Sequence, residues 1–242
     1  MPAQERIVSI TLRDEWITID AIHFHGRWVR SRSGRWMLAH GHIVDPKGGR
    51  WSDSDPTGAV LLLDGGTEVF RLEGLLRPET VAICDVGVFA VYEWGSPTDF
   101  LGQDCHLRVF APDGRQLLKQ RFGAVVCLPA LTSNGRLLAF HTLAAPGTSP
   151  RREDGESVFL LDTSGPAFLW QMPVPFVWPT RITFDEAAQH VVVHGQGEDR
   201  FRYKYTGEFL DAEVVERAKM SRRLADEYGY PLLDLAHERL KE

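Results

Sequence analysis

The chain is short of the features that mark several protein classes. It has three cysteines among 242 residues, and Cys84, Cys105 and Cys127 are not clustered. This odd number, spread along the chain, favours neither a disulfide framework nor a zinc site. The first residues lack the apolar core of a signal peptide, and no apolar run approaches the roughly 18 residues of a membrane helix. We therefore expect a cytoplasmic protein without membrane contact.

Charge of one sign is not in strong excess either. Charged residues make up 25% of the chain, and the formal net charge is −6. One basic segment, with Arg27, Arg30, Arg32 and Arg35 around Trp28 and Trp36, resembles a nucleic-acid patch. Alternation along a strand would divide these arginines between two faces. A nucleic-acid-associated accessory subunit is therefore the third interpretation, and we do not expect nucleic acid as the partner.

What the chain does contain is a repeated hairpin pattern. Residues 126–170 read as a four-stranded antiparallel meander, with turns at 133–135 and 163–165. Two hairpins of this meander recur at intervals of roughly 40–55 residues. The inner hairpin spans 28–41, 81–94, 127–142 and 182–195, and the outer hairpin spans 60–73, 107–120, 158–171 and 201–213. Four copies in strict alternation predict a repeat architecture.

The second strand of each repeat indicates how the sheets are packed. Residues 36–39, 89–92, 137–140 and 191–193 are apolar at successive positions. A sheet with one wet face would alternate between apolar and polar residues instead. Burial on both faces predicts that each meander lies between two others, as the blades of a propeller do. We predict an all-β fold, a small β-propeller of about four to five blades; a β-sandwich would not explain the repeat period.

The segments 158–170 and 109–119 carry a strand, an Asp, a turn with Gly and a second strand. This pattern resembles the repeats of the WD-repeat and quinoprotein-like (pyrroloquinoline-quinone-type) propeller superfamily over about residues 26–211. The resemblance is at superfamily level, because no Trp-Asp pair occurs. The tryptophan ring of quinone-dependent members is not evident, so we expect no cofactor.

Three regions are expected along the chain. Residues 1–25 contain two strands that either complete the last blade or form a partial fifth blade. Residues 26–211 form the four-bladed region. Residues 212–242 change to a helical period, with Asp211 as a possible cap and Pro231 opening a second helix. This helical hairpin is expected to pack on the blades or on a second copy of the chain.

The longest connections between strands all belong to one rim of the predicted propeller. They are residues 43–58, 95–104 and 143–156. A tight turn would serve the fold, so long loops on one rim favour recognition of another protein. The residues expected to bind this partner are Lys47, Arg50, Trp51, Trp94, Asp99, Phe100, Arg151 and Arg152. We therefore predict a non-catalytic interaction module or scaffold; the alternative that these loops are tolerated insertions stays open.

One alternative is a metal-dependent propeller hydrolase. His40, Glu93, His141 and His194 occupy the same place in the second strands of the four repeats, and they are plausible zinc or iron ligands. Second strands lie away from the axis, however, which favours local structural roles. Asp85 and Asp185 at strand ends are possible acids, but such residues commonly form turns. No nucleophile motif or phosphate-binding glycine loop is present.

Overall fold

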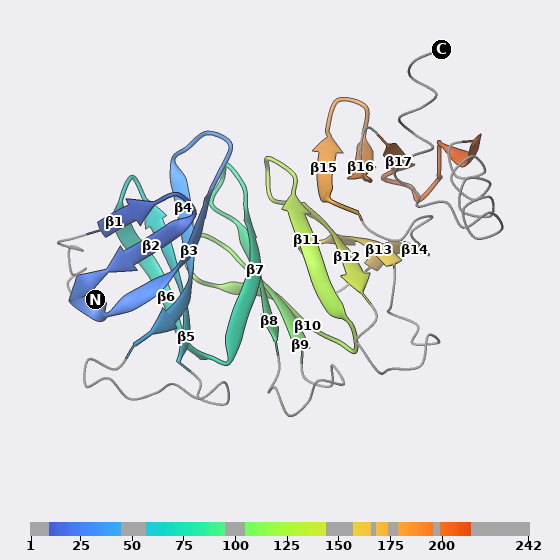
Figure 1. The fold of residues 1–242 in the computed structure, drawn as a ribbon. Coiled ribbons are helices and arrows are strands. Elements are labelled where there is room, and N and C mark those ends of the chain that lie inside the picture. Colours follow the sequence, from blue (N-terminus) through green and yellow to red (C-terminus); the bar gives the residue numbers. More distant parts are fainter. Residues whose placement is uncertain are drawn as a thin grey trace, which may run out of the picture.

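The structure, a computed structural model, describes residues 10–44, 57–94, 105–143, 157–165, 168–173, 179–195 and 199–213. These residues form four antiparallel sheets that follow one another in chain order (Figure 1). The predicted all-β class is confirmed, and the sheets match those of a small propeller. The helical hairpin predicted over 212–242 lies outside the described residues, except for Ala212 and Glu213.

The first sheet is the largest and the last is the smallest. The first contains β1 (Ile10–Arg13), β2 (Trp16–Ile19), β3 (Phe24–Arg30), β4 (Trp36–Ile43), β5 (Gly58–Asp64) and β6 (Thr67–Leu75), with a short 3-10 helix (Asp20–Ile22) before β3. The second contains β7 (Arg77–Ile83), β8 (Phe89–Trp94), β9 (Cys105–Phe110) and β10 (Gln116–Phe122). The third contains β11 (Val125–Leu131), β12 (Leu137–Leu143), β13 (Ser157–Asp162) and β14 (Phe168–Pro173). The fourth contains β15 (Arg181–Asp185), β16 (His190–His194) and β17 (Arg200–Lys204).

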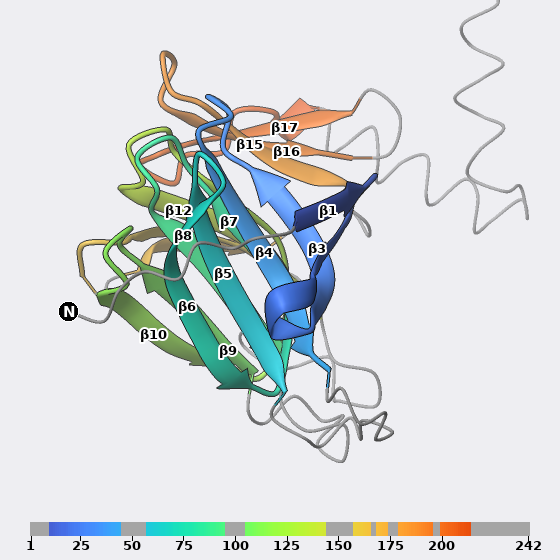
Figure 2. The ribbon, with the colours of Figure 1, turned by 90° about the vertical axis from the view of Figure 1, so that its left-hand side faces the viewer.

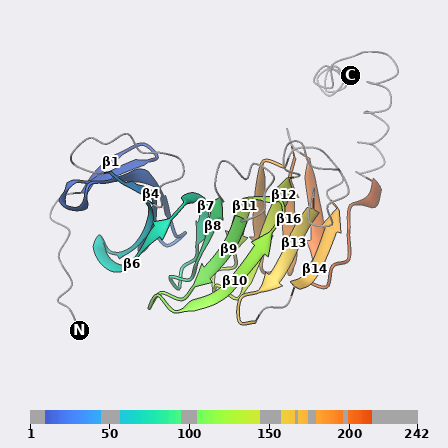
Figure 3. The same ribbon diagram turned by 90° about the horizontal axis from the view of Figure 1, so that it is seen from below.

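The two N-terminal strands, predicted either to complete the last blade or to form a partial fifth blade, belong to the first sheet. β2 pairs with β3, so both β1 and β2 extend the first sheet instead of completing the last one. Ile17 and Ile19 pack with Phe24 and Leu61 in a core of their own. The sheet curls around this core, with β1 and β6 near its two edges (Figure 3). Burial of these isoleucines against their own sheet explains the pairing.

Apolar layers fill the space between successive sheets. Leu38 and Val60 of the first sheet pack with Phe89 and Phe110 of the second. Equivalent layers join the second sheet to the third and the third to the fourth. The middle strands β4, β8 and β12 are therefore buried on both faces, as their sequences predicted. Successive sheets also contact each other along β4, β7, β11 and β15, because β7 contacts β4 and β11, and β11 contacts β15 (Figures 1 and 2).

The two rims of the sheets differ. At one rim, tight turns such as 31–35, 84–88 and 132–136 join β3 to β4, β7 to β8 and β11 to β12. At the opposite rim, residues 44–57, 95–104 and 144–156 join β4 to β5, β8 to β9 and β12 to β13. Among the described residues, no helix has the length and hydropathy needed to cross a membrane.

Candidate functional site: the groove between the inner strands

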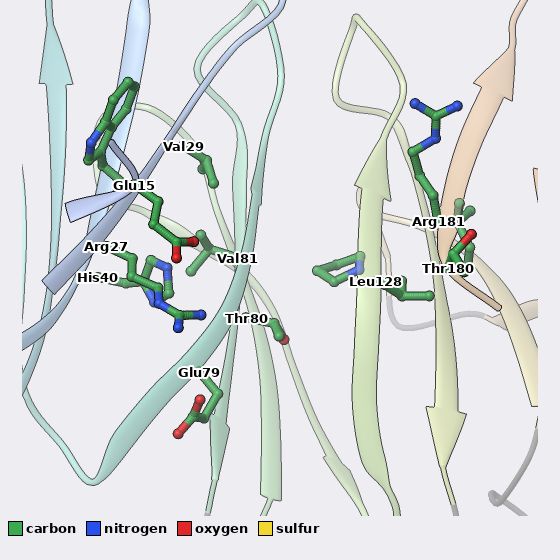
Figure 4. A pocket seen from close by; sticks show the side chains of 13 residues that line it. Glu15, Arg27, Val29, His40, Glu79, Thr80, Val81, Leu128, Thr180 and Arg181 are labelled. Atoms are coloured by element: carbon green, nitrogen blue, oxygen red, sulfur yellow. The ribbon is translucent and has the colours of Figure 1, made fainter. Parts of the chain in front are cut away.

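A groove runs between the inner strands, which are β3, β7, β11 and β15 at the front of the four sheets (Figure 4). Its volume is about 340 Å³. Charged side chains line it from three sheets: Glu15 and Arg27 from the first, Glu79 from the second and Arg181 from the fourth. Leu128, Pro129 and Val81 supply apolar surface between them. The groove thus combines both signs of charge with apolar contact area.

Bulges shape the wall of the groove. β7 and β11 are each the unpaired edge of their sheet, and the register of each shifts beside a proline, at Pro78 and Pro129. Proline and bulges are common at sheet edges because they block pairing with another strand. Leu128, just before Pro129, has a φ of 54°. A leucine in the left-handed region costs about 1–2 kcal/mol, so packing around β11 must stabilise this backbone conformation.

His40 connects the first sheet to the second beside the groove. Its Nδ1 donates a hydrogen bond of 3.0 Å to the backbone carbonyl of Pro78, since a carbonyl can only accept. Burial lowers the pKa of His40, and the hydrogen bond to Pro78 opposes this only in part. The ring is therefore neutral near pH 7, and its Nε2 can accept a hydrogen bond.

An aromatic cluster covers the neighbouring face of β2 and β3. The Trp16 ring stacks on His25, with centroids 5.1 Å apart, and the Arg27 guanidinium lies 5.3 Å from the Trp16 centroid. The hydroxyl of Thr18 forms a hydrogen bond of 3.3 Å with Nδ1 of His25. A second hollow lies here, lined by Thr11, Arg13, Trp16, Thr18 and His25. An exposed, stacked tryptophan beside cations is a surface that suits protein contact.

The four residues of the metal interpretation do occupy equivalent places on β4, β8, β12 and β16, but they do not meet. Glu93 accepts hydrogen bonds from the backbone of Leu76 at 3.0 Å and from Arg108 at 2.6 Å. His194 bonds Thr183 at 2.9 Å, and His141 is buried. In the part of the chain that the structure describes, no group of three His, Cys, Asp or Glu side chains could hold a metal ion. The apolar layers between the sheets separate β4, β8, β12 and β16, so the proposed metal ligands are not brought together.

The possible acids and the basic segment that the sequence suggested also make local contacts where the structure describes them. Asp85 accepts a hydrogen bond from the backbone of Ser33, and Asp185 accepts one from Ala188. Arg30 lies over Trp28, whereas Arg35 pairs with Asp64. Arg27 and Arg30 belong to opposite faces of β3, so the basic segment is not one patch.

Of the residues expected to bind a partner, Trp94 is described and the others are not. It ends β8, is half-buried, and carries the Arg77 guanidinium 5.0 Å from its ring centroid. The others, Lys47, Arg50, Trp51, Asp99, Phe100, Arg151 and Arg152, lie outside the described residues. The groove was not predicted from the sequence. Its available signal was the charge near the starts of inner strands, at Glu79 and Arg181.

Comparison with known proteins supports the fold. No protein-family model matches the chain, and no curated protein matches it. HIRA(644-1017) superposes with a TM-score of 0.50 at 14% identity, covering 87% of this chain and 57% of that one.

Two further solved structures are similar. The β-propeller domain of Cps50 (Swd1) from Myceliophteria thermophila gives a TM-score of 0.48 at 13% identity, over 76% of this chain and 51% of that one. A chain of the Mitotic Checkpoint Complex gives a TM-score of 0.49 at 12% identity, over 82% of this chain and 59% of that one. The chain thus spans between half and three fifths of the structures it matches. At these identities the likeness concerns the fold alone, and at that level it agrees with the β-propeller expected from the sequence.

Proposed function

We propose that the chain is a non-catalytic protein-interaction module that docks a partner protein on the rim carrying residues 43–58, 95–104 and 143–156. The observation that carries this proposal is the difference between the two rims. Turns such as 31–35 and 132–136 reverse the chain in a few residues, so the fold itself needs no more than that. Long connections gathered on one rim of a rigid scaffold are typical of recognition surfaces.

The described residues nearest to this rim fit such a role. Trp94 and Arg77 form a stacked pair there, and Arg77 also pairs with Glu79, which lines the groove. Tryptophan and arginine are the residue types that most often anchor protein interfaces. We propose that Trp94, together with Lys47, Arg50, Trp51, Asp99, Phe100, Arg151 and Arg152, contacts the partner.

Affinity purification with matched variants tests this proposal. The tagged full chain is compared with a variant whose residues 45–56 are replaced by a short Gly-Ser linker, and with Trp94→Ala. Arg115→Ala serves as the control, because Arg115 is exposed in a tight turn of the opposite rim. A partner identified with the wild type is then purified, and its affinity for each variant is measured.

We expect the control to bind like the wild type, and the loop replacement to lower the affinity at least about tenfold. Trp94→Ala should weaken binding by a similar factor. Thermal unfolding checks that each variant is folded, since Trp94 also packs on the core of the second sheet. A folded loop variant with wild-type affinity would contradict the proposal.

A further inference from the structure

The fourth sheet has two chemically different faces. Ile182, Val193 and Phe201 are buried against the third sheet. Because successive side chains of a strand point to opposite faces, their neighbours lie on the face turned away from the third sheet. These neighbours are mostly polar and form rows across β15, β16 and β17. We call this the outer face of the fourth sheet.

One row of this outer face consists of three basic residues. Arg181 lies opposite His194, and His194 lies opposite Arg200. Both arginines are exposed, and Arg181 also lines the groove (Figure 4). Within the described ranges, no carboxylate forms an ion pair with either arginine. The two arginines lie on β15 and β17 with His194 between them, so no ion pair among the described residues accounts for their charges.

The other cations of the same face are neutralised. Arg202 contacts Asp211 at 2.5 Å, and Lys204 contacts Glu208 at 2.7 Å. Both carboxylates follow β17 closely in the chain, so the same local segment balances these two charges. Among the described residues of this face, the uncompensated positive charge is therefore confined to the row of Arg181, His194 and Arg200.

His194 separates the two arginines. Its Nε2 and the hydroxyl of Thr183 are 2.9 Å apart in a hydrogen bond, which orients the ring. Burial lowers the pKa of His194, and the charges of Arg181 and Arg200 lower it further. Near pH 7 the row thus holds two fixed charges whose backbones are two strand spacings, roughly 9–10 Å, apart.

We propose that Arg181, His194 and Arg200 bind an acidic segment of the partner protein that presents two carboxylates. This inference rests on the proposed function in that it names the chemistry of the partner. Guanidinium groups bind carboxylates through paired hydrogen bonds. Carboxylates on alternate residues of an extended segment lie on one side, about 7 Å apart, within reach of both arginines.

A polynucleotide fits the row less well than an acidic peptide does. Affinity for nucleic acid grows with the number of phosphates that basic residues neutralise. The row offers two fixed charges, its neighbours Arg202 and Lys204 are already paired, and the whole chain has a net charge of −6.

Nuclear magnetic resonance titration of the full chain with defined probes tests the proposal. The probes are an end-blocked Gly-Glu-Gly-Glu-Gly peptide, its counterpart with Gln in place of Glu, and inorganic phosphate. The measured quantities are the dissociation constant and the pKa of His194. The variants are the double substitution Arg181→Gln with Arg200→Gln, and Lys204→Gln as a matched control on the same face.

The Glu peptide should bind and raise the pKa of His194, because nearby carboxylates stabilise the imidazolium ion. The Gln peptide should not do so. The double variant should bind the Glu peptide at least about tenfold more weakly, whereas the control should stay within about twofold of the wild type.

Three results would overturn the inference: no binding of the Glu peptide, equal binding by the double variant, or equal effects of the Gln peptide. An effect of phosphate on His194 as large as that of the Glu peptide would also overturn it, because the row would then be a general anion site. The titration requires neither the partner nor the long connections. The titration can therefore fail while replacement of residues 45–56 still abolishes partner binding. Conversely, the Glu peptide can bind while that replacement leaves partner binding unchanged.

Discussion

Asp85 reaches from the second sheet to the first, where its carboxylate accepts a hydrogen bond of 2.6 Å from the backbone N–H of Ser33. The same relationship recurs between the third and fourth sheets. There Glu186 accepts hydrogen bonds of 2.7 Å from both the backbone and the hydroxyl of Ser133. In each case a serine in the tight turn of one sheet is bound by an acid in the tight turn of the next. These contacts join neighbouring sheets at the rim opposite the long connections.

Asp85→Ala should lower the free energy of unfolding by about 1 kcal/mol, the usual net value of such a hydrogen bond. The hydrogen bond from Ser33 lowers the pKa of Asp85 below that of an unfolded aspartate. Its contribution is therefore present above the unfolded pKa near 3.9 and is lost as the pH falls through the lower folded value. Urea unfolding at pH 7 and pH 3 measures both effects.

Asp113→Ala is the matched control for Asp85. Asp113 also accepts a backbone hydrogen bond, from Arg115, but within its own turn. If Asp85→Ala and Asp113→Ala cost the same, the contact between sheets contributes nothing beyond local turn structure.

Gly87 lies in the turn between β7 and β8 with a φ of 81°. A Cβ there would lie 2.7 Å from the Trp36 ring and 2.9 Å from Pro112. Gly34 has a similar φ of 77° but open space around the corresponding position. Gly34→Ala should therefore cost about 1–2 kcal/mol of backbone strain. Gly87→Ala should cost a further 1–3 kcal/mol or so, because Trp36 must move.

Chemical unfolding of the two glycine variants separates these terms. Equal costs at Gly34 and Gly87 would mean that Trp36 yields freely and that the first two sheets are not tightly packed at this turn.

The sequence predicted the sheets because each middle strand is apolar on both faces, as in β4 with Leu38 and Ala39. Strand type follows from such local patterns. Which strand an edge strand pairs with does not follow from local patterns, because it depends on the core that its side chains enter. The isoleucines of β2 could equally have packed in the core of another sheet. The groove was missed for a similar reason, since Glu79 and Arg181 are about a hundred residues apart and come to line one groove only through sheet packing.

Arg202 and Asp211 join the edge strand β17 to the segment that follows it. The Asp211 carboxylate accepts a hydrogen bond of 2.7 Å from the backbone of Arg202 and contacts its guanidinium at 2.5 Å. Asp211 is 9% exposed. Asp211, which the sequence suggested as a helix cap, thus binds the neighbouring strand, and the two residues that follow it, Ala212 and Glu213, are helical.

A double-mutant cycle with Arg202→Ala and Asp211→Ala should give a coupling energy of about 1–2 kcal/mol at pH 7. The exposed pair Lys204 and Glu208 provides the comparison, with an expected coupling below about 1 kcal/mol. The hydrogen bonds from Arg202 lower the pKa of Asp211, so its coupling should fade as the pH drops below about 4. Equal coupling energies in the two pairs would contradict the structural role of Asp211.

His141 lies on β12 with 2% of its surface exposed, and burial lowers its pKa to about 4. In the unfolded chain the pKa returns to about 6.5, so the unfolded state binds a proton that the folded state does not. Stability is therefore greatest above pH 6.5 and falls as the pH drops towards 4, by on the order of 2–3 kcal/mol. Unfolding by urea between pH 7.5 and 4.5 measures this slope. His141→Gln should reduce the slope and leave the smaller share that His40 and His194 contribute, whereas His190→Gln, at a partly exposed site on β16, should leave most of it unchanged. A slope that survives His141→Gln intact would show that another group takes up the proton.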